Sequence, residues 1–364
     1  MIPIAKPYIK DEEIKAVTAI LKSGMLSCGT KAKELEEKFA KLCQRKFGLS
    51  TANGTSALHS ALHVLKIKKG DQVITTPFTF IASASCAEMV GAKVVFADID
   101  EKTLNIDPKS VKEKITDKTK AIVAVDIFGQ PFDYDAIKEI ADDNNLAIVE
   151  DASQAVNAQY KDKIAGSLGD VSTFSLYATK NITAGEGGIV VFDDKSFYEE
   201  IIRFRHHGQS AKTKGEHVEL GYNYRMTDIQ AAIAVEQLKR VDFLTNQRIE
   251  NARYLSEHLK KIKGIEIPYI SENVKHVFHQ YVIRIKDIGM SRDELCEHFR
   301  KNDVFASVHY PLPLHLNGLY LEKGYKKGDF PIAEQACKEV LSLPVHPSLS
   351  KEDLDKIIDI LGDI

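Results

Sequence analysis

Lys180 is the residue of this 364-residue chain whose position most favours covalent chemistry. It lies in the polar segment Ala-Thr-Lys-Asn, between an alternating β-branched and aromatic run over 171–177 and a short apolar run over 189–192. Such runs are typical of β-strands. A lysine held between two buried strands would be desolvated, which lowers the pKa of its ammonium and leaves an amine able to form a Schiff base. On this stretch alone, a solvated loop lysine is the alternative.

Two acids end the apolar segment 146–151, and that position could also carry chemistry. Ligands bind α/β sheets at the carboxyl ends of parallel strands, so one carboxylate, that of Asp151, could face a ligand there. Asp151 could equally cap the segment that follows. We expect Glu150 to be structural.

The segment Asn53-Gly54-Thr55-Ser56 has the pattern of an anion site. It follows a short strand and begins an apolar helix, so free backbone N–H groups and the positive end of the helix dipole would face a phosphate. The alternative is that Thr55 or Ser56 only caps the helix. Phe80, placed after another predicted strand, could stack on a flat ligand or belong to the core.

The elements that must position these residues alternate between strand and helix from about residue 47 to 192. This alternation predicts an α/β fold whose large, mostly parallel sheet has helices on both faces. Thr227 or Asp228 caps a long, bent helix that reaches about residue 261, after which the composition changes to that of a smaller α+β domain. We expect a large domain over 1–240, whose N-terminal segment could pack on the small domain, and a small domain over 241–364.

The composition excludes several functional classes. A formal net charge of −3 implies neither a nucleic-acid nor a membrane partner, and no apolar run approaches the roughly 18 residues of a membrane span. The chain has five cysteines, never in a C-x-x-C pair, which favours a reducing compartment, the cytoplasm, and argues against a zinc site. No G-x-G-x-x-G follows the first strand, which argues against a nicotinamide-dependent enzyme.

Seven segments together resemble the DegT/DnrJ/EryC1/StrS family of pyridoxal-phosphate-dependent nucleotide-sugar aminotransferases. Three of them are EDASQA at 150–155, GSLGDVSTFSLYATKNITAGEGGIVV at 166–191 and LGYNYRMTDIQAAI at 220–233. The other four are IPIAKPYI, ANGTSAL, PFTFIAS and VHYPLPLH. They follow the family's order over nearly the whole chain, so the resemblance implies a fold-type I transferase.

The resemblance implies a role for each candidate site residue. Lys180 would bind the cofactor aldehyde and move the proton in catalysis, and Asp151 would pair with the pyridinium nitrogen. The other expected cofactor contacts are Gln154 at the ring oxygen, about one helical turn from Asp151, Phe80 on the ring face, and Gly54, Thr55 and Ser175 at the phosphate. Asn223 would reach the cofactor phosphate of the other subunit of a homodimer. His309, Tyr310 and Arg225 are candidates for substrate binding.

The function implied is transfer of an amino group to a keto-sugar on a nucleoside diphosphate, with pyridoxamine 5′-phosphate formed between the half-reactions. L-glutamate is the expected amino donor, and C4 of the sugar the expected position. One alternative is a lysine-retaining sugar deaminase or dehydratase with the same cofactor. Another is a non-catalytic regulator on this fold, although Lys180, Asp151 and Ser175 argue for catalysis.

Overall fold

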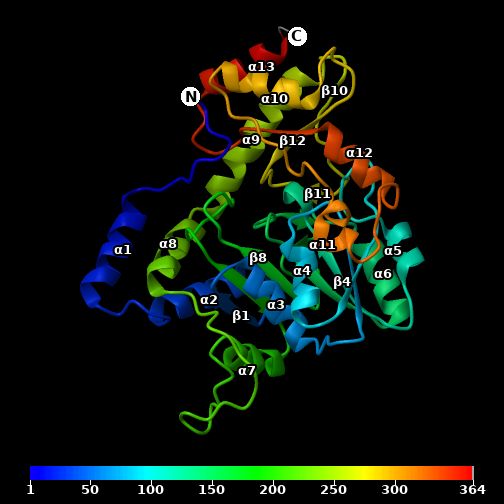
Figure 1. The fold of residues 1–364 in the computed structure, drawn as a ribbon. Helices are drawn as coiled ribbons and strands as arrows, with labels where there is room; N and C mark the ends of the chain where they lie inside the picture. Colours follow the sequence, from blue (N-terminus) through cyan, green and yellow to red (C-terminus); the bar gives the residue numbers. More distant parts are fainter. Residues whose placement is uncertain (363–364) are drawn as a thin grey trace.

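A seven-stranded sheet forms the centre of the molecule (Figure 1), in a computed structural model that describes residues 1–362. Its order is β1-β9-β8-β5-β4-β2-β3, and only β9 runs against the other strands. The expectation of a mostly parallel sheet is therefore confirmed. The strands are β1 (Phe47–Thr51), β9 (Gly188–Phe192), β8 (Val171–Ser175), β5 (Ala147–Asp151), β4 (Thr119–Val125), β2 (Gln72–Thr75) and β3 (Lys93–Phe96).

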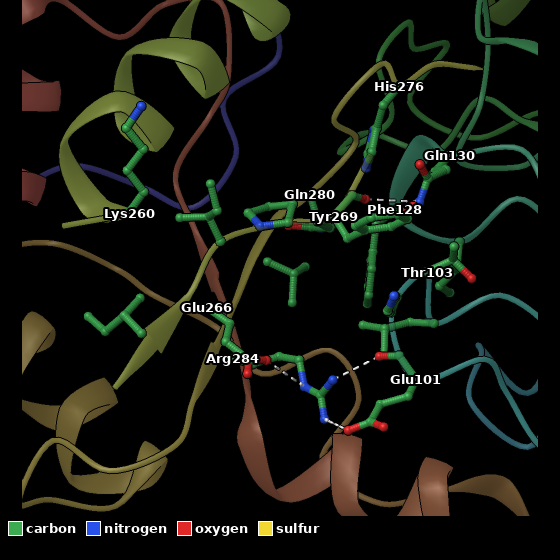
Figure 2. Close-up of a pocket in the computed structure, with 17 residues that line it drawn as sticks. Glu101, Thr103, Phe128, Gln130, Lys260, Glu266, Tyr269, His276, Gln280 and Arg284 are labelled. Carbon is green, nitrogen blue, oxygen red and sulfur yellow. Dashed lines mark hydrogen bonds and ion pairs between the residues drawn. The ribbon is translucent and has the colours of Figure 1, made fainter. Parts of the chain in front are cut away.

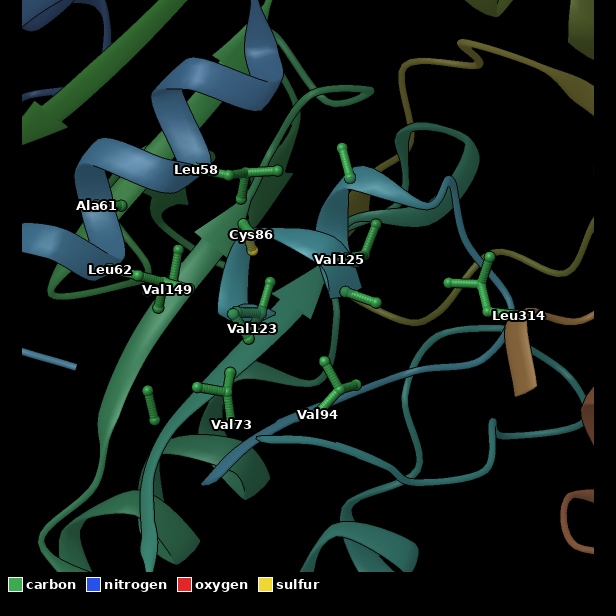
Figure 3. Close-up of a cluster of buried hydrophobic side chains, with 14 of the residues drawn as sticks. Leu58, Ala61, Leu62, Val73, Cys86, Val94, Val123, Val125, Val149 and Leu314 are labelled. Atoms are coloured by element: carbon green, nitrogen blue, oxygen red, sulfur yellow. The ribbon is translucent and has the colours of Figure 1, made fainter. Parts of the chain in front are cut away.

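Helices cover both faces of this sheet because successive strand residues point to opposite sides. Val73, Val123 and Val149 pack with α3 (Gly54–Val64) and α4 (Ala82–Met89) on one face, the cluster drawn in Figure 3. The next residues toward the other face, such as Ile74 and Ile122, pack with α5 and α6. The remaining helices around the sheet are α2 (Thr30–Leu42), α5 (Pro108–Lys114), α6 (Tyr134–Asn144), α7 (Lys195–Phe204) and α8 (Asp228–Leu238).

The long helix expected from residue 228 is two helices, α8 and α9 (Val241–Leu259), with Lys239 and Arg240 between them. α8 is buried against the large sheet. The first turn of α9 still packs there through Leu244, whereas Leu255 and Leu259 lie in a separate core. The break lets one chain segment serve two cores.

That separate core surrounds a three-stranded antiparallel sheet in the order β10-β12-β13. The strand β10 is only two residues long, and the strand β13 has no counterpart in the sequence analysis. The elements here are β10 (Ile265–Glu266), β12 (Tyr281–Ile285), β13 (Val340–Leu343), α10 (Arg292–Lys301) and α13 (Lys351–Gly362). None of the helices within residues 1–362 is long and apolar enough to cross a bilayer.

The chain passes between the two cores more than once. Ile2 at the N-terminus belongs to the small core and exchanges backbone hydrogen bonds with 303–305, whereas Phe330 and Ala333 return to the large core. The division into 1–240 and 241–364 therefore stays a prediction. The remaining elements are α1 (Asp11–Ser23), α11 (Gly318–Leu321), α12 (Pro331–Glu339) and the small sheet of β6 (Gln159–Tyr160), β7 (Lys163–Ile164) and β11 (Val274–Lys275).

Asp228 joins α8 to the start of α2. Thr227 is the residue that caps α8, and the buried Asp228 carboxylate instead accepts the N–H groups of Gly29 at 2.8 Å, Ala32 at 2.9 Å and Lys31 at 3.2 Å. These donors have no acceptor within α2, and a negative charge at a helix N-terminus is favourable.

Replacing Asp228 with Ala should lower the free energy of unfolding by about 2 kcal/mol or more, because buried N–H groups lose a charged acceptor. Urea unfolding followed by circular dichroism measures this change. Asp228→Asn is the matched control and should lose less, since its amide oxygen can still accept. Equal stability of the Ala variant and the unmodified chain would contradict the assignment.

Candidate active site

A cavity of about 570 Å³ lies at the carboxyl ends of β5 and β8, between the large sheet and the small domain. Most of the residues expected to do chemistry line it, although they come from distant parts of the chain. These are Gly54, Thr55, Phe80, Asp151, Gln154, Ser175, Lys180, His309 and Tyr310. The chemical groups predicted from sequence therefore converge on one site.

Lys180 lies in the connection between β8 and β9, where its backbone N–H donates to the carbonyl of Tyr177 at 3.0 Å. Its side chain is half-buried and lines the cavity. Desolvation lowers the pKa of the amine to about 8, and the nearby negative charge of Asp151 opposes this shift. A substantial neutral fraction near physiological pH makes this amine a nucleophile, unlike a solvated loop lysine.

The buried carboxylate of Asp151 is held from two sides. Its Oδ2 accepts the hydroxyl of Ser83 at 2.7 Å, and its Oδ1 accepts the backbone N–H of Ser153 at 3.2 Å. Both sequence interpretations thus apply, because Asp151 caps the following turn and also faces the cavity. Ser83 is a positioning residue that the sequence analysis missed, although it lies within the recognised segment PFTFIAS.

Glu150 occupies the opposite face of β5 from Asp151. Its buried carboxylate accepts the N–H groups of Gly166 at 2.8 Å and Leu168 at 3.0 Å and the hydroxyl of Ser172 at 2.6 Å. Burial beside this carboxylate raises the pKa of Asp126 well above its usual range. Glu150 therefore holds the loop that leads into β8, which agrees with the structural role expected for it.

The start of α3 forms a cradle for an anion. Asn53, rather than Thr55 or Ser56, is the cap, since its side chain accepts the N–H of Ser56 at 2.9 Å and Ser56 Oγ accepts the Asn53 N–H in return. The N–H groups of Gly54 and Thr55 have no intrahelical acceptor. A Cβ on Gly54 would stand 3.0 Å from Ser175 Cβ, so glycine allows this close approach.

Aromatic and amide groups shape the rest of the cavity wall. Phe80 lines the cavity and is 58% exposed, so its ring is available to a flat ligand. Gln154 Oε1 accepts the N–H of Phe128 at 2.9 Å, and its Nε2 donates to the hydroxyl of Tyr310 at 3.3 Å. The expectation of helical spacing between Asp151 and Gln154 is wrong, because this segment is a turn that backbone–side-chain hydrogen bonds stabilise.

Two imidazoles line the side of the cavity that belongs to the small domain. His309 Nδ1 lies 3.0 Å from Ser342 Oγ, and burial together with the charge of Lys180 lowers the pKa of His309 to about 4. His279 is 7% exposed, and burial together with the charges of Lys180 and Arg248 lowers its pKa well below its usual range. The sequence analysis missed His279, because the surrounding Val-Phe-His-Gln-Tyr carries no motif of its own.

Asn223 and Arg225 lie outside this cavity. Asn223 is exposed and forms an isolated bridge with His206, and the Arg225 guanidinium contacts the ring of His206. The structure therefore does not bring these two candidates to the group around Lys180.

A second cavity of about 610 Å³ lies beyond Phe128 and Gln280, which line both cavities (Figure 2). Its arginine is already paired, since the Arg284 guanidinium lies 2.6 Å from Glu339 and donates to the carbonyl of Glu101 at 2.8 Å. Its two lysines, Lys102 and Lys260, are exposed, whereas the Lys180 side chain in the first cavity is half-buried.

The first cavity suits pyridoxal phosphate as a cofactor. Lys180 offers an amine for an aldehyde, Asp151 a fixed negative charge for a ring nitrogen, and the start of α3 an anion cradle. The close approach of Gly54 to Ser175 brings that cradle next to β8. These three groups thus match the aldehyde, the ring nitrogen and the phosphate of pyridoxal phosphate.

Comparison with known proteins gives one family. The model of the DegT/DnrJ/EryC1/StrS aminotransferase family matches residues 7–362. Over the whole chain, the sequence is 38% identical to the spore coat polysaccharide biosynthesis protein SpsC of Bacillus subtilis, covering 97% of that protein. It is also 38% identical to a pleiotropic regulatory protein of Geobacillus stearothermophilus, covering 97% of it, and 35% identical to GDP-perosamine synthase of Escherichia coli O157:H7, covering 98% of it.

Solved structures agree with this match. DesV of S. venezuelae superposes with a TM-score of 0.92 at 33% identity, over 97% of this chain and 94% of that one. Spr1654 from Streptococcus pneumoniae, a candidate sugar aminotransferase solved in PLP and PMP forms, superposes with a TM-score of 0.94 at 29% identity, over 100% of this chain and 98% of that one. The fold-type I architecture is thereby confirmed.

The lowered pKa of Lys180 gives a prediction for the protein without cofactor. Only the neutral amine reacts with acetic anhydride, so acetylation of Lys180 should rise with pH to a midpoint near 8. Mass spectrometry of the Lys180 peptide after a trace of reagent measures this, with the exposed Lys195 of the same sample as the comparison. A Lys180 profile that follows that of Lys195 would contradict the account.

Proposed function

This chain belongs to the DegT/DnrJ/EryC1/StrS aminotransferase family, and from that premise we propose that it moves an amino group from an amino acid to a keto-sugar on a nucleoside diphosphate, with pyridoxal 5′-phosphate as its cofactor. Its class of enzyme is that of the sugar aminotransferases. The observation that carries the proposal is the Lys180 amine, with its pKa lowered to about 8, in one cavity with the fixed carboxylate of Asp151.

Each end of the cofactor has a set of residues to hold it. Gly54, Thr55 and Ser175 would bind the phosphate, and Asp151 would keep the ring nitrogen protonated. Phe80 would cover one face of the ring, and Gln154 would contact the ring oxygen. When bound, pyridoxal phosphate supplies a reactive carbonyl carbon and a ring that accepts electrons.

Lys180 performs two tasks in this account. Its neutral amine holds the cofactor before the amino donor arrives, since desolvation favours that form. With the cofactor and donor bound, the freed amine would act as the base that takes the proton from the donor's α-carbon and as the acid that returns it. A pKa near 8 suits both directions of this transfer at neutral pH.

The acceptor and donor are more specific parts of the proposal. The 35% identity to a GDP-perosamine synthase supports a sugar on a nucleoside diphosphate as the acceptor. The N-terminal half of the sequence resembles the branch that forms 4-amino sugars, which favours C4. L-glutamate is the proposed donor. The identity to SpsC supports a product used in polysaccharide biosynthesis.

Two other functions use the same fold. A sugar deaminase or dehydratase would keep Lys180 and the cofactor but would not accept an amino group from a donor. A regulator has a basis in the relative named as a pleiotropic regulatory protein. The convergence of Lys180, Asp151 and the anion cradle favours catalysis, because a regulator needs no amine with a lowered pKa.

A homodimer with shared active sites is the proposed assembly. Asn223 is exposed and lies outside the cavity of its own chain, where it could reach the cofactor phosphate of a second copy. Leu220 and Val218, 78% and 54% exposed, lie nearby on the same segment and would be covered by that copy.

Lys180→Ala should lower the rate of transamination by roughly 10⁴-fold or more, because it removes both the nucleophile and the acid–base group. The folded variant should still bind added pyridoxamine 5′-phosphate, which needs no link to a lysine. Activity with a 4-keto sugar nucleotide and equilibrium dialysis measure the two effects. Retention of full activity by the variant would contradict the role of Lys180.

Mixing two inactive variants tests the shared site. Asn223→Ala weakens the contact to the other copy's cofactor, and Lys180→Ala removes the amine from its own cavity. Mixed dimers place one intact Lys180 site beside an intact Asn223, so some activity should return. If activity does not return although subunits exchange, each chain has a self-contained site.

A further inference from the structure

The proposed reaction brings an amino acid into the cavity, so its α-carboxylate needs a partner there. Within residues 1–362, no arginine lines this cavity, and Lys180 is its only lysine. Lys180 is occupied by the chemistry of the reaction. Among the described residues, this chain's own lining therefore offers no guanidinium to pair with the carboxylate in the usual bidentate manner.

His279 and His309 are the donors that remain beside Lys180. The hydroxyl of Ser342 occupies Nδ1 of His309, while Nδ1 of His279 is buried without a hydrogen-bond partner. Both rings are neutral, since burial and the Lys180 charge hold their pKa values down. A neutral imidazole still carries one N–H group that can donate to an anion.

Arg248 contacts the backbone of His279. It is 5% exposed, and its Nη1 donates to the carbonyls of Phe278 at 3.2 Å and His279 at 3.4 Å. Among the described residues it has no carboxylate within ion-pair distance, and its Nε has no hydrogen-bond partner. It lines a small void together with Lys180, so its positive charge is close to the reacting centre. A buried cation without a counter-ion favours an anion nearby.

We propose that His279 and His309, with Arg248 behind them, form the subsite that binds the α-carboxylate of the amino-acid donor. This inference rests on the proposed aminotransferase function and deepens it. Arg248 acts as a positioning residue, because it fixes the backbone of 278–279 and supplies charge without touching the substrate.

The order in which the two substrates bind explains why imidazoles suit this part of the cavity. The same cavity must bind an anionic amino acid first and an uncharged sugar ring second. A guanidinium in the lining would stay buried without its carboxylate while the sugar is bound, which is unfavourable. An imidazole can donate to a carboxylate and then to a sugar hydroxyl, so one pair of residues serves both half-reactions.

The test compares two donors in the first half-reaction, followed by the absorbance of the bound cofactor. L-glutamate carries the α-carboxylate, and L-isoglutamine has an uncharged amide of the same shape in its place. The unmodified enzyme should prefer L-glutamate by about 10²-fold, which corresponds to the loss of a charged hydrogen-bonding partner. His279→Gln should reduce this preference about tenfold, through a slower reaction of L-glutamate alone.

Matched variants separate the subsite from general damage. His276→Gln also replaces a buried imidazole, one that stacks on Phe278 and lines the second cavity (Figure 2), and it should keep the full preference. Arg248→Lys keeps the positive charge and should retain more of the preference than Arg248→Gln. If His279→Gln does not fold, His309→Gln carries the same test.

A binding measurement gives a readout apart from turnover. Glutarate, which lacks the amino group, should shift the imidazole NMR resonances of His279 and His309 in the cofactor-loaded enzyme and leave those of His276 unchanged. An unmodified enzyme that reacts with no amino acid would overturn the proposed function itself. An active enzyme whose His279 and His309 variants both keep the full preference for L-glutamate would overturn only this inference.

Discussion

Burial of the Lys180 amine beside the Asp151 carboxylate is the interaction on which the rest of the structure depends. Desolvation makes the amine a nucleophile near neutral pH, and it requires that the surrounding protein exclude water and supply the opposite charge. The β8–β9 connection holds the lysine, and the end of β5 holds the aspartate, which Ser83 fixes from α4. Glu150 secures the loop before β8 from the other face of the sheet.

The same constraint explains the division of the chain between two cores. The large sheet supplies the amine, the carboxylate and the anion cradle, which must keep fixed distances from one another. The small domain supplies His279 and His309, which would contact the substrates. Because α9 begins in one core and ends in the other, these two parts are tied together by a single helix. Neutral imidazoles on the substrate side let one cavity accept an anionic donor and then a sugar.

Strand ends, where ligands bind α/β sheets, identified several of these residues as candidates, and the family resemblance supplied their roles. Lys180, Asp151 and Gly54 each stand directly after or before a clear apolar run. Ser83, His279 and Arg248 could not be found this way, since their roles come from tertiary contacts, such as the Ser83–Asp151 hydrogen bond between residues 68 positions apart. The break at Lys239–Arg240 and the strand β13 were not predicted for the same reason, because the packing of two cores overrides the local hydrophobic pattern of the sequence.

An absorption spectrum of the purified protein with pyridoxal phosphate, before and after L-glutamate, tests the central claim most directly. The account predicts a visible band that depends on Lys180 and that gives way to the spectrum of pyridoxamine phosphate when L-glutamate is added. A band that ignores every amino acid would contradict the aminotransferase function and favour a deaminase or dehydratase. The absence of any band would contradict the role of Lys180 itself and favour a regulator.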